Sequence, residues 1–120
     1  MEKETDTHSG AKEGRAVFNW RMIFRIKASE QFPRLTLSIF DVGLAGNEAI
    51  GELTLDLRAS MKLLNRVGVL EDKKIWAPFY NPSKNNAQVG YCLIQMKLLH
   101  SSDAESDPVG EARDEPNKDP

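Results

Sequence analysis

The side chains that could carry out catalytic chemistry are few and lie far apart in the sequence. The two histidines, His8 and His100, stand near the margins of the folded part, and Cys92 is the single cysteine. One cysteine excludes an internal disulfide and a multi-cysteine metal site, and a lone cysteine is typically a small buried apolar residue. No Ser/His/Asp or Cys/His set and no glycine-rich phosphate loop stands out. The sequence therefore predicts that the chain is not an enzyme.

Positive charge offers a clearer chemistry, along residues 17–27, VFNWRMIFRIK. With the period of two of a β-strand, one face carries the cations Arg21, Arg25 and Lys27. The other face is apolar and aromatic, with Phe18, Trp20, Met22, Phe24 and Ile26. Lys and Arg near an anionic membrane contribute about 1 kcal/mol each. Two interpretations stay open: a solvated outer face of a sheet, or a basic patch for lipid headgroups.

Charge and composition limit the remaining classes of function. The net charge of −2 hides an asymmetry, because residues 101–120 hold seven acids and two bases, and the rest of the chain is mildly basic. A nucleic-acid binder usually shows a denser basic stripe, so no nucleic-acid partner is expected. We predict one domain over residues 1–100 and a disordered linker or tail over 101–120, where Pro, Asp, Glu and Ser dominate.

The elements that would position these side chains are mostly strands. Alternating apolar residues predict strands starting near Arg34 and Ile50, joined by a Gly-, Asn- and Asp-rich connection over 41–49. Residues 58–67 suit a short helix that Ser60 could cap and Gly68 would end. The further expected elements are an edge strand or extended segment over 69–80, around Pro78, a turn over 81–87, and a last strand over 88–99.

A strand ending in Asp41, a short loop and a strand starting Ile50-Gly51-Glu52 resemble the third loop of a C2-type domain. Three longer stretches are similar to ferlin sequences in particular. These are TDTHSGAKEGRAVFNWRMIFRI (5–26), FDVGLAGNEAIGELTLDL (40–57) and DPVGEARDEPNKDP (107–120). The last of them resembles the linker between the final C2 domain of ferlins and their C-terminal transmembrane helix.

This resemblance implies an all-β fold, a C2-type antiparallel β-sandwich with one short helix and a disordered acidic tail. About five of its eight strands can be placed, so we expect an incomplete C2 domain, the C-terminal-most one of a ferlin. Ferlins are tail-anchored proteins with several C2 domains that act in vesicle trafficking and membrane fusion. The implied partners are an anionic phospholipid membrane, at its cytoplasmic face, and neighbouring C2 domains of a longer chain.

The resemblance also bears on calcium, which C2 domains bind through carboxylates of their first and third loops. Asp41 matches the first acidic position of the third loop, Gly43 occupies the second, and Glu48 stands near a later one. Calcium takes six to eight oxygen ligands, which two carboxylates cannot supply. Asp41 and Glu48 are therefore candidates for an incomplete metal site, and we expect no cofactor and weak or no dependence on calcium.

A second class of function fits the same residues. The poor calcium loop and the acidic tail are also typical of a protein-interaction or structural domain that packs on neighbouring domains. The sequence leaves both classes open.

Overall fold

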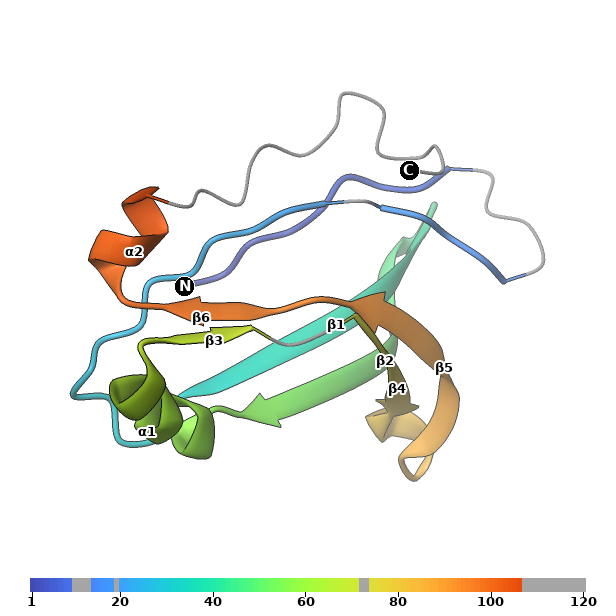
Figure 1. Cartoon of the computed structure of the whole chain (residues 1–120). Helices are drawn as coiled ribbons and strands as arrows, with labels where there is room; N and C mark the ends of the chain where they lie inside the picture. Colours follow the sequence, from blue (N-terminus) through green and yellow to red (C-terminus); the bar gives the residue numbers. More distant parts are fainter. Residues whose placement is uncertain (10–13, 19, 72–73, 107–120) are drawn as a thin grey trace. The chain divides into compact units, whose positions relative to one another are not determined.

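The computed structural model describes residues 1–9, 14–18, 20–71 and 74–106, and for 69–71 it describes the backbone alone. The chain divides into two compact units: Met1–Arg25 with Ser102–Pro120, and Ile26–Ser101. Among the described residues, every strand and the longer helix lie within the second unit (Figure 1). Its elements are β1 (Arg34–Gly43), β2 (Gly46–Asp56), α1 (Arg58–Val67), β3 (Val69–Glu71), β4 (Ile75–Asn81), β5 (Ala87–Ile94) and β6 (Lys97–Leu99).

Strands β1 and β2 form one long antiparallel hairpin, paired from Arg34↔Asp56 to Gly43↔Gly46 with an irregularity between Ile39 and Phe40. Leu35, Leu37 and Ile39 are half-buried and alternate with exposed residues, as the period of two predicts. The predicted connection over 41–49 is wrong, because the ladder continues to Gly46. Gly46 has a φ of 119°, a left-handed conformation that glycine adopts without steric cost.

The remaining four strands form two antiparallel pairs. Strand β4 pairs with β5, and β3 pairs with β6, so the sheets are ordered β1-β2-β4-β5 and β3-β6. Glu71 and Ile75 are four positions apart in the sequence, whereas their partners Lys97 and Ile94 are three positions apart. The two ladders are therefore one residue out of register with each other. The last strand, predicted as continuous over 88–99, is thus divided into β5 and β6.

Strand β4 is not the edge strand that Pro78 predicts, because it lies between β2 and β5. The proline is tolerated because β2 pairs with β4 at a single position, Glu52↔Tyr80, away from Pro78. A proline lacks the N–H that a second ladder at this point would need. On its paired side Pro78 faces Tyr91 of β5.

The core of the second unit is small and centres on Phe79, which is 1% exposed. Leu57, Leu64 and Ala77 are also buried. Gly51 of β2 faces Phe79 so closely that a Cβ on Gly51 would lie 3.2 Å from Phe79 Cβ and 2.9 Å from Val89 Cγ2. A glycine is therefore required where β2 crosses Phe79.

Helix α1 spans the ten residues that the sequence predicts. Its start is fixed by Asp56, whose Oδ1 accepts the backbone N–H of Arg58 at 3.0 Å, and not by Ser60, which lies inside the helix. Gly68 ends it at a φ of 83°, and the Gly68 N–H donates to the Leu64 carbonyl at 2.8 Å. The helix buries Leu64 toward the core.

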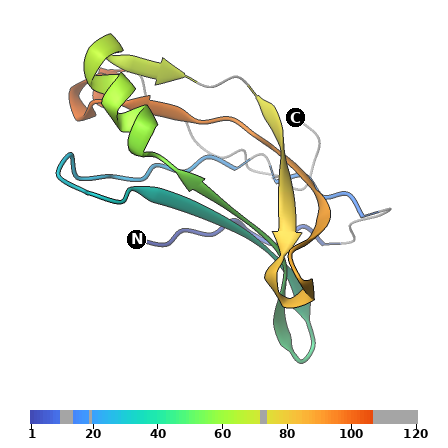
Figure 2. The same ribbon diagram turned by 90° about the horizontal axis from the view of Figure 1, so that it is seen from below.

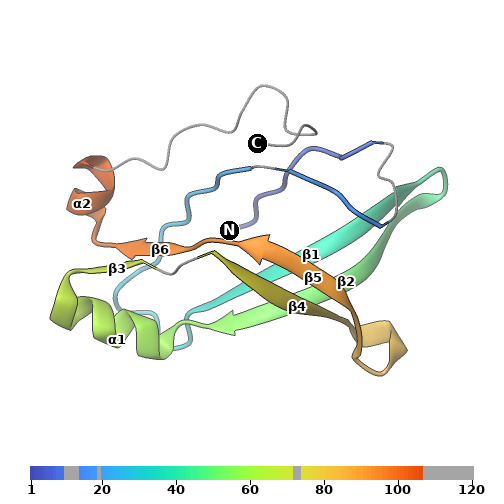
Figure 3. The ribbon, with the colours of Figure 1, turned by 45° about the vertical axis from the view of Figure 1, so that its right-hand side comes forward.

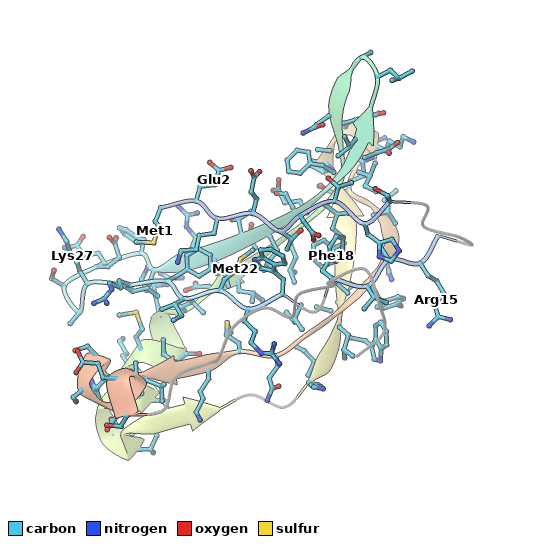
Figure 4. All side chains as sticks on the ribbon, turned by 90° about the horizontal axis from the view of Figure 1, so that it is seen from above. Met1, Glu2, Arg15, Phe18, Met22 and Lys27 are labelled. Atoms are coloured by element: carbon cyan, nitrogen blue, oxygen red, sulfur yellow. The ribbon has the colours of Figure 1, made fainter. Side chains whose placement is uncertain are left out.

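The strand predicted over 17–27 is wrong for the described residues of that range, which belong to no ladder. The alternation survives in part: Phe18, Met22 and Phe24 are half-buried, while Trp20 and Ile26 are slightly above one-third exposed. Figure 4 shows Phe18 and Met22 on the run that leads from Arg15 to Lys27. Apolar periodicity alone did not make a strand here, because a strand also needs a hydrogen-bonded neighbour.

The expected fold class is confirmed: the described residues are mostly antiparallel β-sheet with few helices, as in an incomplete C2-like sandwich. A second short helix, α2 (Ser101–Ser106), occupies the start of the predicted tail, and residues 107–120 lie outside the described part. The domain boundary at residue 100 stays a prediction. Among the helices described, none is long and apolar enough to cross a membrane.

We predict that Gly51→Ala lowers the free energy of unfolding by about 1–3 kcal/mol, because the new methyl group overpacks the contact with Phe79. Urea denaturation followed by tryptophan fluorescence measures this change. Gly90→Ala is the matched control, since a Cβ at Gly90 meets no atom within 4 Å. Equal stability of the two variants would contradict the close contact.

Candidate functional site

The two predicted carboxylates, Asp41 and Glu48, are brought together by the hairpin. They are direct cross-strand partners near the end of the β1–β2 ladder, and both are exposed. The Cβ atoms of such partners lie about 4.5–5.5 Å apart on one face of a sheet. The sequence identified both residues, but it placed them in an open loop and not on paired strands.

Two carboxylates in this position can attract a cation but cannot enclose one. They supply four oxygens at most, fewer than the six to eight that calcium takes. Within the described residues, no group of three or more His, Cys, Asp or Glu side chains is placed to hold a metal ion. A complete site would therefore need ligands from elsewhere, and the metal-binding role of Asp41 and Glu48 stays a prediction.

The end of this hairpin carries exposed apolar side chains that the sequence analysis missed. Leu44 stands in the turn and is fully exposed, at 112% of its reference area, and Phe40 and Val42 are 54% and 55% exposed. The hairpin end reaches beyond the β4–β5 connection (Figure 2). The signal was available, because Leu44-Ala45 occupies a turn position where polar residues are usual. We call Phe40, Val42 and Leu44 the hairpin tip.

The predicted basic row is not assembled on one strand. Arg21, Arg25 and Lys27 are all exposed, but no ladder orders them, and Lys27 belongs to the second unit while the two arginines belong to the first. Arg21 also has an interaction partner. Their role in lipid binding stays a prediction.

The N-terminal segment is held by its histidine. The backbone N–H of Val17 donates to His8 Nδ1 at 2.9 Å, and the His8 ring meets Phe18 edge to face with centroids 6.4 Å apart. The Lys3 ammonium lies 5.5 Å from the centre of the Phe24 ring. The contacts of His8 with Val17 and Phe18 give this histidine a structural role in the first unit.

Cys92 lies on β5 opposite Ala77 and is partly buried. Burial raises the pKa of its thiol above the ordinary value, because an apolar surrounding disfavours the thiolate. The thiolate is the reactive form of cysteine, so this environment suits a packing role.

Three curated proteins are similar to nearly the whole chain. Ferlin 2 of Tetrahymena thermophila is 41% identical over 119 residues, which are 98% of this chain and 7% of that protein. Ferlin 1 of Toxoplasma gondii is 37% identical over 120 residues, covering 98% of this chain and 8% of that protein. Ferlin 2 of Toxoplasma gondii is 32% identical over 127 residues, covering 98% and 9%.

The chain thus spans less than a tenth of the length of these three relatives. No protein-family model and no solved structure matches it.

We predict that calcium stabilises this chain little, because the carboxylates of the hairpin cannot complete a coordination shell. The measurement is the melting temperature during a calcium titration, with magnesium as the control cation. A clear upward shift at micromolar calcium would show tight binding to the native state and contradict this expectation.

Proposed function

Because the chain belongs to the ferlin family, we propose that it is a membrane-docking C2 module, the C-terminal-most one of its parent protein. In this proposal it binds phospholipid with weak or no dependence on calcium, at the cytoplasmic face of a membrane and within a tail-anchored chain. The parent protein acts in vesicle trafficking and membrane fusion, and the neighbouring C2 domains are its further partners.

The observation that carries this proposal is the hairpin tip. Leu44 and Val42 expose aliphatic side chains at the end of a long hairpin, and burying such a side chain is worth about 1.5–3 kcal/mol each. A lipid interface offers that burial. Asp41 and Glu48 lie next to the tip and oppose an anionic surface by an amount of the order of 1 kcal/mol each. The apolar term is the larger one, so the tip favours insertion without selecting anionic lipid.

Selectivity for anionic lipid must then come from cations. Arg21, Arg25 and Lys27 are exposed and are the candidates that the sequence offers. Their contribution is electrostatic, so it decreases as salt screens the surface.

One observation favours the alternative function, a domain that packs on neighbouring domains. On one face of β4 and β5, Trp76 is 66% exposed and Tyr91 is 62% exposed, and their cross-strand partners are Leu93 and Pro78. Tryptophan and tyrosine are enriched in protein–protein interfaces. We call Trp76, Pro78, Tyr91 and Leu93 the aromatic face.

We predict that Leu44→Ser weakens binding to phosphatidylcholine–phosphatidylserine vesicles about tenfold or more, because the largest exposed apolar group of the tip is lost. Co-sedimentation with vesicles measures the affinity. The matched control is Tyr91→Ser on the aromatic face, which should bind vesicles like the unaltered chain.

The same pair of variants separates the two functions. Unchanged vesicle binding by Leu44→Ser would refute docking through the tip. Loss of binding to a neighbouring C2 domain in Tyr91→Ser, with vesicle binding intact in both variants, would favour the interaction domain.

A further inference from the structure

The outer surface of α1 carries a row of cations that neither the hairpin tip nor residues 21–27 account for. Arg58, Lys62 and Arg66 follow one another at intervals of four residues, so they lie on one side of the helix, and all three are exposed. The helix contains no acidic residue from end to end. Arg58 is partly neutralised by Asp56, whose Oδ2 accepts the Arg58 Nε–H at 2.9 Å. Lys62 and Arg66 therefore supply most of the charge of this row.

An apolar row lies directly beside the cations. Leu63 and Val67, each one residue after a cation, are 41% and 57% exposed. At the start of the helix Phe32 is 62% exposed, and the Arg58 guanidinium lies 6.0 Å from the centre of its ring. The buried residues Leu57 and Leu64 mark the side that faces the core. The helix thus has a packed side, an exposed aliphatic row and a cationic row.

We propose that this outer surface of α1 docks on the anionic surface of a phospholipid bilayer. Leu63 and Val67 lie at the boundary with the acyl chains, and Lys62 and Arg66 contact lipid phosphates. Helices that lie in a membrane interface combine an apolar stripe with Lys and Arg beside it. The stems of Lys and Arg let the charged groups reach the phosphates while the helix lies deeper.

The size of the surface favours a bilayer over a protein partner. A ten-residue helix is about 15 Å long and about 10 Å wide, so its outer face covers roughly 150 Å². This area is far smaller than the roughly 800 Å² that each partner contributes to a stable protein interface. A bilayer accepts a small apolar contact because charge attraction adds to it.

This site is separate from the hairpin tip, and the inference holds even if docking through the tip is refuted. Helix α1 follows the end of β2 that pairs with Arg34, whereas the tip closes the other end of the same ladder. Figure 3 shows α1 and the end of the hairpin at opposite ends of the β1–β2 pair. The α1 surface also supplies the preference for anionic lipid that the tip lacks.

The test uses the whole chain and vesicles of phosphatidylcholine with or without phosphatidylserine. We expect Lys62→Gln with Arg66→Gln to weaken binding to the anionic vesicles about 30-fold, with no change on neutral vesicles. The matched control is Lys74→Gln with Lys84→Gln, which removes the same charge from exposed positions outside α1 and should have little effect. Equal loss in both double variants would overturn the proposal, because net charge alone would then explain it.

A second variant tests the apolar row. We expect Leu63→Gln with Val67→Gln to lower the affinity for anionic vesicles at high salt, where charge attraction is screened and the apolar contact remains. Circular dichroism checks that the fold of this variant is kept. Unchanged binding by this variant would overturn interfacial docking.

Leu44→Ser should leave the preference for anionic over neutral vesicles intact, which separates this site from the tip. Binding to polyglutamate that depends on Lys62 and Arg66, without binding to vesicles, would assign the surface to an acidic protein and overturn the proposal.

Discussion

The contact between Gly51 and Phe79 is the constraint on which the second unit depends. The β1–β2 hairpin and the β4–β5 pair share only the pairing Glu52↔Tyr80, too little backbone hydrogen bonding to fix their arrangement. Phe79, almost fully buried, supplies the missing connection by packing against the bare backbone of Gly51. The two hairpins therefore form one sheet because the Phe79 side chain occupies the space above Gly51, which has no side chain. The Ile-Gly-Glu sequence that suggests a C2-type strand thus has a packing reason in this chain.

The sequence predicted an element correctly where interactions between neighbouring residues determine it. The bounds of α1 follow from the helical spacing of its apolar residues and from Gly68, because a glycine adopts the left-handed φ at the end of a helix without steric cost. The strands starting at Arg34 and near Gln88 follow from alternating apolar residues. The turn before β5 follows from its asparagines: Asn85 and Asn86 both have positive φ, which asparagine tolerates better than most residues.

The errors arose where backbone pairing, which local composition does not reveal, decides the outcome. The composition of 41–49 is typical of a loop, but a ladder uses backbone groups that every non-proline residue has, so the hairpin continued through Asp41 and Glu48. The pairing of β3 with β6 joins residues that are far apart in the sequence and leaves no local pattern. For the site, the sequence identified both carboxylates. It missed the tip, although Leu44-Ala45 in a turn was a signal. It missed the α1 surface because the exposure of Leu63 and Val67 is known only once the side of the helix that faces the core is known.

The hairpin tip and α1 lie at opposite ends of the β1–β2 pair, so this pair holds the two proposed docking surfaces apart. The ten residues of β1 extend about 34 Å between the two ends. Because β1 is paired with β2 along this length, the two ends cannot fold back onto each other. One flat bilayer meets both ends only if the β1–β2 pair lies along its surface. If both ends bind lipid and the pair stands upright, the second contact falls on another bilayer, and the length of one strand then sets the distance between the two membranes.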